Sequence, residues 1–102
     1  MFLVRNVFHA KPGKAKALVE TFKKAAPHME ASGVVKNTRI LTDSATTFWT
    51  VVVETEVEDL NAYLNMAKTM SQNSEFAEIV KGYVEQANGG YREIFLIEHN
   101  SK

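Results

Sequence analysis

The sequence contains no cysteine among its 102 residues, so neither a disulfide nor a thiolate metal site can form. Basic and acidic residues number 12 each, which leaves no net charge. A nucleic-acid-binding domain usually carries a basic face, so this balance argues against a nucleic-acid partner. No apolar run approaches the roughly 20 residues that a membrane-spanning helix needs. We therefore expect a cytoplasmic protein that binds neither nucleic acid nor a membrane.

Histidine is scarce as well, and the three histidines lie far apart, at His9, His28 and His99. No two of them have the spacing of metal ligands on one helix or strand. Gly89 and Gly90 stand together without the lysine and serine of a phosphate-binding loop, and no serine stands in a nucleophile elbow. The sequence therefore predicts no metal and no cofactor.

The longest β-favouring stretch spans residues 47–56 and reads TFWTVVVETE. An exposed strand would alternate apolar and polar residues, but both faces of this one are largely apolar. Its two faces are Trp49, Val51 and Val53 on one side, and Phe48, Thr50, Val52 and Glu54 on the other. We predict a central strand that is covered on both sides.

The remaining periodicities place this strand third in the order β-α-β-β-α-β, within a single domain over residues 1–102. Strands are predicted at 2–9, 35–42 and 91–98, and helices at 13–32 and from residue 60 onward in two pieces. Pro27 is expected to kink or divide the first helix. Thr55 to Glu58 matches a capping box for the second helix, and residues 88–90 are predicted to form a turn.

This order predicts an α+β protein of the ferredoxin-like class, with a four-stranded antiparallel sheet and helices on one face only. The first and third strands are then central. The uncovered face is expected to carry a set of large apolar side chains: Phe2, Val4, Phe8, Phe48, Val52, Phe95 and Ile97. A soluble monomer rarely exposes so much apolar surface, so we predict a homodimer that packs sheet to sheet around a lumen.

Three segments carry a resemblance to a known group: NVFHAKPGK at 6–14, ETEVEDL at 54–60 and SEF at 74–76. They resemble the strand-to-helix junctions and the late-helix start of the dimeric α+β barrel superfamily, especially its NIPSNAP-like and antibiotic-biosynthesis-monooxygenase-like domains. The resemblance implies a dimeric α+β barrel whose cavity binds a small molecule. For the monooxygenase-like members it implies cofactor-independent oxidation of an electron-rich aromatic substrate.

The haem-degrading branch of this superfamily uses an asparagine, a tryptophan and a histidine at three matched positions. Asn6 matches the asparagine, but Glu54 stands at the tryptophan position, and the histidine position falls near Val80. The resemblance therefore excludes haem degradation.

Asn6 and Glu54 are the candidate catalytic residues. Asn6 is a polar residue in a central strand, where a buried amide needs a partner. In the enzyme that the resemblance implies, Asn6 would orient the substrate and Glu54 would accept its proton. The alternatives are a satisfied cavity amide for Asn6, and for Glu54 a rim carboxylate paired with a lysine or an arginine.

The candidate ligand contacts are Phe8, Phe48, Thr50, Tyr83, Phe95 and Arg39. Arg39 would clamp an anionic group, although a solvated arginine is the alternative, and core packing is the alternative for Tyr83. We predict a homodimeric barrel protein that binds a small, largely apolar molecule in its lumen, with monooxygenase-like activity if it is an enzyme. A binding protein without turnover, and a non-catalytic module with a filled interface, remain alternatives.

Overall fold

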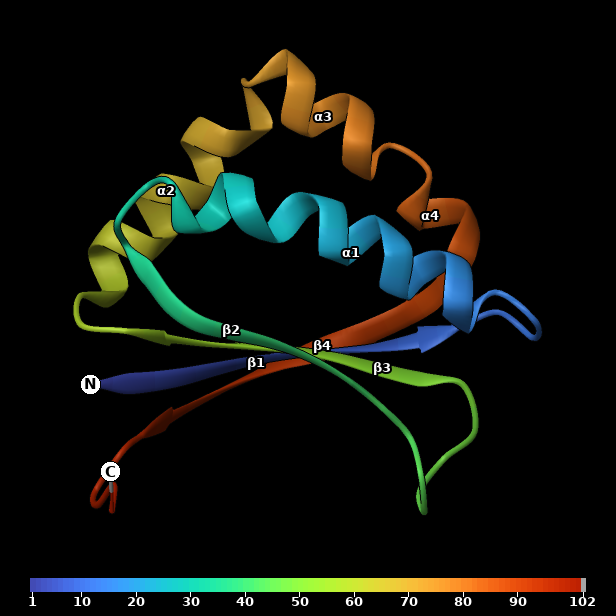
Figure 1. Cartoon of the computed structure of the whole chain (residues 1–102), viewed down its shortest axis with the longest axis horizontal. Helices are drawn as coiled ribbons and strands as arrows, with labels where there is room; N and C mark the ends of the chain where they lie inside the picture. Colours follow the sequence, from blue (N-terminus) through green and yellow to red (C-terminus); the bar gives the residue numbers. More distant parts are fainter. Residues whose placement is uncertain (102) are drawn as a thin grey trace.

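The computed structural model describes residues 1–101, apart from the side chain of Val84. The chain folds into one sheet covered on one side by helices, while the other side of the sheet is bare (Figure 1). In chain order the elements are β1 (Phe2–Ala10), α1 (Ala15–Glu30), β2 (Val35–Thr42), β3 (Thr50–Val57), α2 (Leu60–Ser71), α3 (Ser74–Val80), α4 (Tyr83–Gln86) and β4 (Ala87–Leu96).

The sheet has the strand order β2-β3-β1-β4, and every neighbouring pair is antiparallel. β1 and β3 are therefore central, while β2 and β4 form the edges. This is the ferredoxin-like α+β arrangement that the element order predicted. β3 is buried along nearly its whole length, as its two apolar faces require.

The core lies between the sheet and the helices in two clusters. At one end, Leu18 of α1 packs on Val51 of β3. At the other end, Tyr63 and Met66 of α2 pack on Val4 of β1. Burying each of the large apolar side chains contributes about 1.5–3 kcal/mol, so these contacts hold α1 and α2 on the same face of the sheet.

The structure corrects the predicted faces of β1. Phe2, Val4, Asn6 and Phe8 point toward the helices, whereas the sequence placed them on the uncovered face. The reason is that both faces of β1 are apolar, since Leu3 and Val7 alternate with them. The local pattern is therefore ambiguous, and the packing of Val4 against Tyr63 and Met66 of α2 decides the face.

β3 begins at Thr50, three residues later than predicted. Trp49 adopts a positive φ of 64°, a left-handed conformation outside the extended region, and β3 begins at the next residue. The indole of Trp49 turns toward α1, the side on which the sequence placed it, and lines a groove with Ala15 and Val19. Phe48 borders the same groove and is 80% exposed, so its predicted position on the uncovered sheet face is wrong.

Two helix predictions also need correction. α1 continues through Pro27, and Ala31 N–H donates to the Pro27 carbonyl at 3.0 Å, so the proline does not divide it. α2 is capped by Asp59, whose carboxylate accepts from the Asn61 and Ala62 amides. The predicted capping box fails because β3 runs on through Thr55, whose hydroxyl donates to the Lys36 carbonyl of β2.

The last strand starts earlier than its sequence pattern indicated. Asn88, Gly89 and Gly90 were predicted to form a turn, but β4 already begins at Ala87. Their pairing with β1 continues through a register shift between Phe8 and Ala10. The glycines therefore mark an irregular stretch of a strand, and this stretch borders the pocket described next.

Candidate functional site

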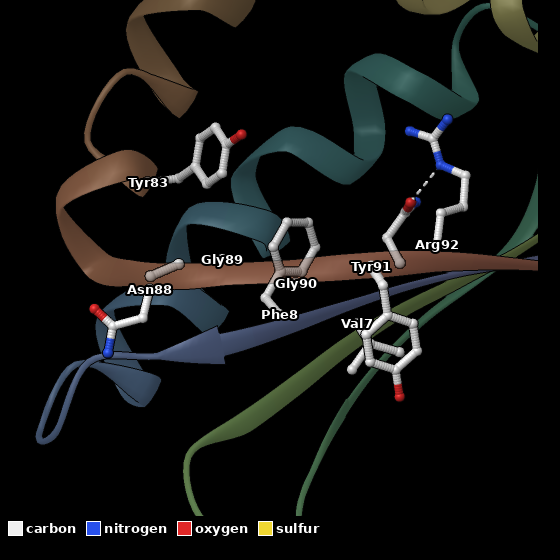
Figure 2. A pocket seen from close by; sticks show the side chains of 10 residues that line it. Val7, Phe8, Tyr83, Asn88, Gly89, Gly90, Tyr91 and Arg92 are labelled. Atoms are coloured by element: carbon white, nitrogen blue, oxygen red, sulfur yellow. Dashed lines mark hydrogen bonds between the residues drawn. The ribbon is translucent and has the colours of Figure 1, made fainter.

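A pocket of about 600 Å³ opens between the sheet and the helical layer, where β4 leaves α4 (Figure 2). Its walls come from β1, α4 and the first half of β4. The lining residues are Asn6, Val7, Phe8, Tyr83, Ala87, Asn88, Gly89, Gly90, Tyr91 and Arg92. This volume lies within the range of known small-molecule sites.

The polar end of the pocket is built around Asn6. Arg92 Nε donates to Asn6 Oδ1 at 2.7 Å, the dashed line in Figure 2. Asn6 Nδ2 in turn donates to the hydroxyl oxygen of Tyr63 at 3.4 Å. The Arg92 guanidinium carbon lies 5.4 Å from the centre of the Tyr63 ring, within the range of a cation–π contact. The amide thus joins β1, β4 and α2.

The apolar wall is aromatic. The ring centres of Phe8 and Tyr83 are 6.0 Å apart in an edge-to-face arrangement, and Phe8 also packs on Phe22 of α1 at 4.8 Å. Phe22 and Tyr83 complete the group with centres 6.5 Å apart. The three aromatic rings thus support one another, and two of them face the pocket.

The strand side of the pocket depends on Gly90. A Cβ at this position would lie 2.0 Å from the Val7 carbonyl oxygen and 3.0 Å from the Phe8 Cα. Only glycine therefore allows β4 to approach β1 so closely here. The side chains of Val7 and Tyr91 point to the opposite face of the sheet (Figure 2), so Phe8, Asn6 and Arg92 supply the side chains on the helix side.

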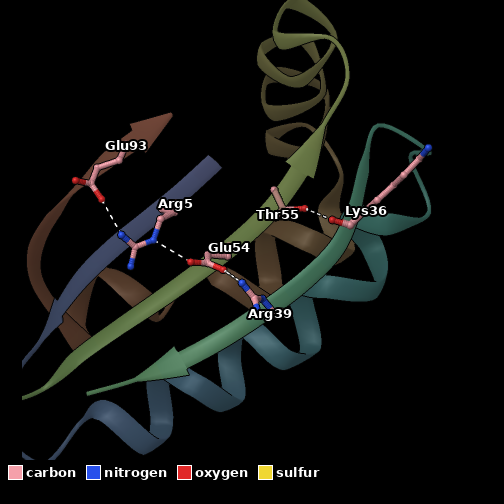
Figure 3. A network of polar contacts seen from close by, with 6 residues as sticks. All are labelled: Arg5, Lys36, Arg39, Glu54, Thr55 and Glu93. Carbon is pink, nitrogen blue, oxygen red and sulfur yellow. Dashed lines mark hydrogen bonds and ion pairs between the residues drawn. The ribbon is translucent and has the colours of Figure 1, made fainter. Parts of the chain in front are cut away.

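Glu54 lies on the other, uncovered face of the sheet within a chain of ion pairs (Figure 3). One carboxylate oxygen accepts from Arg5 Nε at 2.9 Å, and the other accepts from Arg39. Arg5 Nη1 also pairs with Glu93 Oε1 at 3.0 Å. Although Glu54 is on the uncovered face, its side chain is only 8% exposed, because the two arginine side chains cover it.

The structure thus brings together only some of the predicted site residues. Asn6, Phe8 and Tyr83 meet in the pocket. The others do not reach it: Glu54, Thr50, Phe95 and Arg39 share the uncovered face by their strand register, and Phe48 lies in the groove against α1. Asn6 and Glu54 therefore cannot act on one substrate within this pocket, and the ion-paired alternative for Glu54 is the arrangement found.

Two residues of the site were missed from the sequence. They are Arg92 of β4 and Tyr63 of α2, neither of which was among the candidate residues. Arg92 is the single cation within β4, and its register opposite Asn6 gives it its position. Once the first and last strands are recognised as neighbours, a polar residue in the middle of each strand, Asn6 and Arg92, is a usable signal of the site.

Two further features are absent from the described part of the chain. Over residues 1–101, no group of histidine, aspartate and glutamate side chains is arranged to hold a metal ion. Within the same range, no helix is long and apolar enough to cross a membrane. The predicted cytoplasmic location stays a prediction.

Comparison with solved structures defines the class to which this fold belongs. An uncharacterized NIPSNAP-like domain protein from Burkholderia xenovorans matches with a TM-score of 0.81 and 14% identity, covering 99% of this chain and 88% of the other. A NIPSNAP family protein from Agrobacterium tumefaciens matches with a TM-score of 0.79 and 7% identity, covering 97% and 88%. A "putative antibiotic biosynthesis monooxygenase" from Nitrosomonas europaea matches with a TM-score of 0.76 and 11% identity, covering 97% and 100%.

At these identities the similarity establishes the fold, which is the one shared by NIPSNAP domain proteins and antibiotic biosynthesis monooxygenase-like proteins. The resemblance seen in the sequence is confirmed at that level. No protein-family model matches the chain, and the search of curated proteins finds no match either.

Proposed function

We propose that this protein binds a small, largely apolar molecule in the pocket between β1, β4 and α4. The observation that carries the proposal is the Asn6–Arg92 hydrogen bond at 2.7 Å beside the ring of Phe8 within a 600 Å³ pocket. A few fixed polar groups beside an apolar wall are the usual composition of a small-molecule site. The sequence placed the ligand in a lumen between two copies, and the proposed pocket lies instead within one chain.

Titration with the neutral fluorescent probe N-phenyl-1-naphthylamine tests this proposal. The wild-type protein should bind one probe per chain, and Tyr83→Ala should weaken binding about tenfold by removing part of the aromatic wall. Phe48→Ala is the matched control, because Phe48 is an exposed aromatic residue outside the pocket. Absence of probe binding, or a loss caused by Phe48→Ala and not by Tyr83→Ala, would overturn the proposed site.

A monooxygenase-like reaction is the second candidate. Some proteins with this fold carry that name, and Asn6 lines the pocket, where it would orient a bound aromatic ring. The reaction converts an activated CH₂ of the substrate to a carbonyl, and O₂ accepts the electrons and leaves one oxygen as water. Glu54 does not serve as the base in this pocket, because both its oxygens are engaged on the other face. Oxygen consumption with an anthrone, compared between wild type and Asn6→Ala, tests this candidate, and equal rates would overturn a role of Asn6.

We also propose that the uncovered sheet face binds a second copy of this chain. Tyr91 and Phe95 on this face are 55% and 49% exposed, a large aromatic surface for a monomer. The ion-paired groups on this face, two arginines and two glutamates, balance in charge, so two copies can meet there around a twofold axis without net repulsion from this network. Sedimentation equilibrium should give twice the 11.4 kDa chain mass, and Tyr91→Lys should shift the protein toward monomer. A wild-type protein that stays monomeric at micromolar concentration would contradict the proposal.

A further inference from the structure

The chain has three arginines, and two of them already have carboxylate partners. Arg5 pairs with Glu54 and Glu93, and Arg39 pairs with Glu54. Arg92 differs: within residues 1–101 its side chain makes one hydrogen bond, to the neutral amide of Asn6, and no ion pair. Its sequence neighbour Glu93 points to the opposite face of the sheet and is held there by Arg5.

A guanidinium carries five N–H donors, so most of those on Arg92 remain available. The two terminal nitrogens form the planar fork that matches a carboxylate or a sulfonate. Arg92 is nevertheless held in position, because Nε is bonded to Asn6 and the guanidinium lies over the Tyr63 ring at 5.4 Å. Since Tyr63 is only 3% exposed, this support is itself fixed by the core. A positioned cation loses little conformational entropy when it binds an anion.

The surroundings of Arg92 define the remainder of the ligand. Phe8 and Tyr83 present aromatic surface to the same pocket, and Gly89 and Gly90 add no side chain to fill it. Among the described residues that line the pocket, none carries a carboxylate, so an anionic group bound there meets no like charge. The pocket therefore combines one unpaired cation with an aromatic wall.

We propose that the ligand of this pocket is an aromatic molecule with one anionic group, a carboxylate or an equivalent oxyanion, which Arg92 binds. The aromatic body packs against Phe8 and Tyr83, and Asn6 holds the guanidinium in its orientation. This inference rests on the proposed ligand-binding function and adds the chemical class of the ligand. It assigns Arg92 as the residue that distinguishes anionic from neutral aromatic compounds.

A matched pair of fluorescent probes tests the inference. 1-Anilinonaphthalene-8-sulfonate has the same ring system as N-phenyl-1-naphthylamine and carries one additional sulfonate. The wild-type protein should bind the sulfonate probe about tenfold more tightly than the neutral one, the usual scale of a hydrogen bond to a charged group. Arg92→Gln should remove this preference, so that the two probes bind with affinities within about twofold of each other.

Two further variants complete the experiment. Arg92→Lys keeps the positive charge but lacks the fork, so it should retain part of the preference, and it also covers the case that Arg92→Gln folds poorly. Lys68→Gln removes a positive charge from the exposed face of α2 and should change neither affinity. Tyr83→Ala should weaken the binding of both probes, since it alters the aromatic wall.

The outcomes separate this inference from the proposed function. If both probes bind in the pocket with equal affinity, or if Arg92→Gln leaves the preference for the sulfonate probe intact, the anionic class is wrong and ligand binding stands. If neither probe binds, or if Tyr83→Ala changes neither affinity, the proposed binding function itself fails, and the assignment of Arg92 fails with it.

Discussion

Arg92 Nε donates a hydrogen bond of 2.7 Å to Asn6 Oδ1 across two paired strands, the edge strand β4 and the central strand β1. The two residues are 86 positions apart in the sequence and directly opposite in the sheet. A shift of one residue in this register would turn Arg92 to the uncovered face. The polar end of the pocket therefore depends on the pairing of β1 with β4.

The first prediction concerns Asn6. Asn6→Ala removes the hydrogen bonds to Arg92 and Tyr63, and we expect the free energy of unfolding to fall by about 1–3 kcal/mol, since one of the two bonds involves a charged group. Urea denaturation followed by circular dichroism measures the change. Asn65→Ala on the exposed surface of α2 is the control and should have an effect below about 0.5 kcal/mol. Equal stabilities of the two variants would contradict a supporting role for the Asn6 amide.

The second prediction uses two glycines with opposite environments. Gly90→Ala places a Cβ 2.0 Å from the Val7 carbonyl oxygen, so the backbone must move, and we expect a loss of about 1–3 kcal/mol. Gly82→Ala is the matched control, because the nearest atom to its Cβ is Gln86 Nε2 at 4.0 Å and its φ is −84°. Gly82→Ala should be neutral or stabilising by up to about 1 kcal/mol. Denaturation midpoints that decrease equally would show that β1 and β4 are not so close at Gly90.

The third prediction distinguishes the cap found at α2 from the one expected from the sequence. Asp59→Ala removes the acceptor for the Asn61 and Ala62 amides and should destabilise the protein by about 1 kcal/mol. Glu58→Ala removes the glutamate of the expected capping box, and we predict a change below about 0.5 kcal/mol, because its contact with Lys36 is an exposed ion pair. A larger loss of stability for Glu58→Ala than for Asp59→Ala in thermal unfolding would contradict the Asp59 cap and support the capping box.

The fourth prediction concerns Glu54. Glu54→Gln leaves Arg5 and Arg39 without their shared anion, and we expect the free energy of unfolding to fall by about 1–3 kcal/mol. Lys36→Gln breaks an exposed pair whose side chains are 57% and 71% exposed, so it should cost below about 0.5 kcal/mol. Both variants are compared at one protein concentration, because self-association would add to stability.

The same Glu54→Gln variant should bind N-phenyl-1-naphthylamine as the wild-type protein does, since Glu54 lies across the sheet from the pocket. A loss of probe affinity without a loss of stability would contradict this prediction and would show that Glu54 contributes to ligand binding.

Much of the architecture follows from short-range patterns. The second strand was predicted at 35–42 and is found at Val35–Thr42, because its polar edge-strand pattern is bounded by Gly33 and by turn residues. Asn73 has a residue type favoured at helix N-caps, and its side chain accepts from the Phe76 amide at 3.0 Å. The central position of β3 follows from its two apolar faces, and the β-α-β-β-α-β order then defines the fold.

The candidate site was only partly predictable, for reasons that individual residues make clear. Asn6 and Phe8 were identified, yet they were placed on the wrong face, because both faces of this strand mix apolar and polar residues: Arg5 follows Leu3 on one face, and Asn6 follows Val4 on the other. Arg92 carries no local signal of its role. Its partner lies on another strand, and the register between them is a property of the folded sheet.

The sequence alone determined the class of fold, the strand order and the one-sided helical cover, because hydrophobic periodicity and turn residues act over a few neighbouring positions. Only the tertiary structure decided that Asn6 contacts Arg92 and Tyr63. It also decided that Glu54 lies on the opposite face of the sheet, between Arg5 and Arg39. The physical reason is that strand pairing sets which residues share a face, and packing against the helices selects which of two similar faces is covered. That selection requires contacts between segments that lie far apart in the chain.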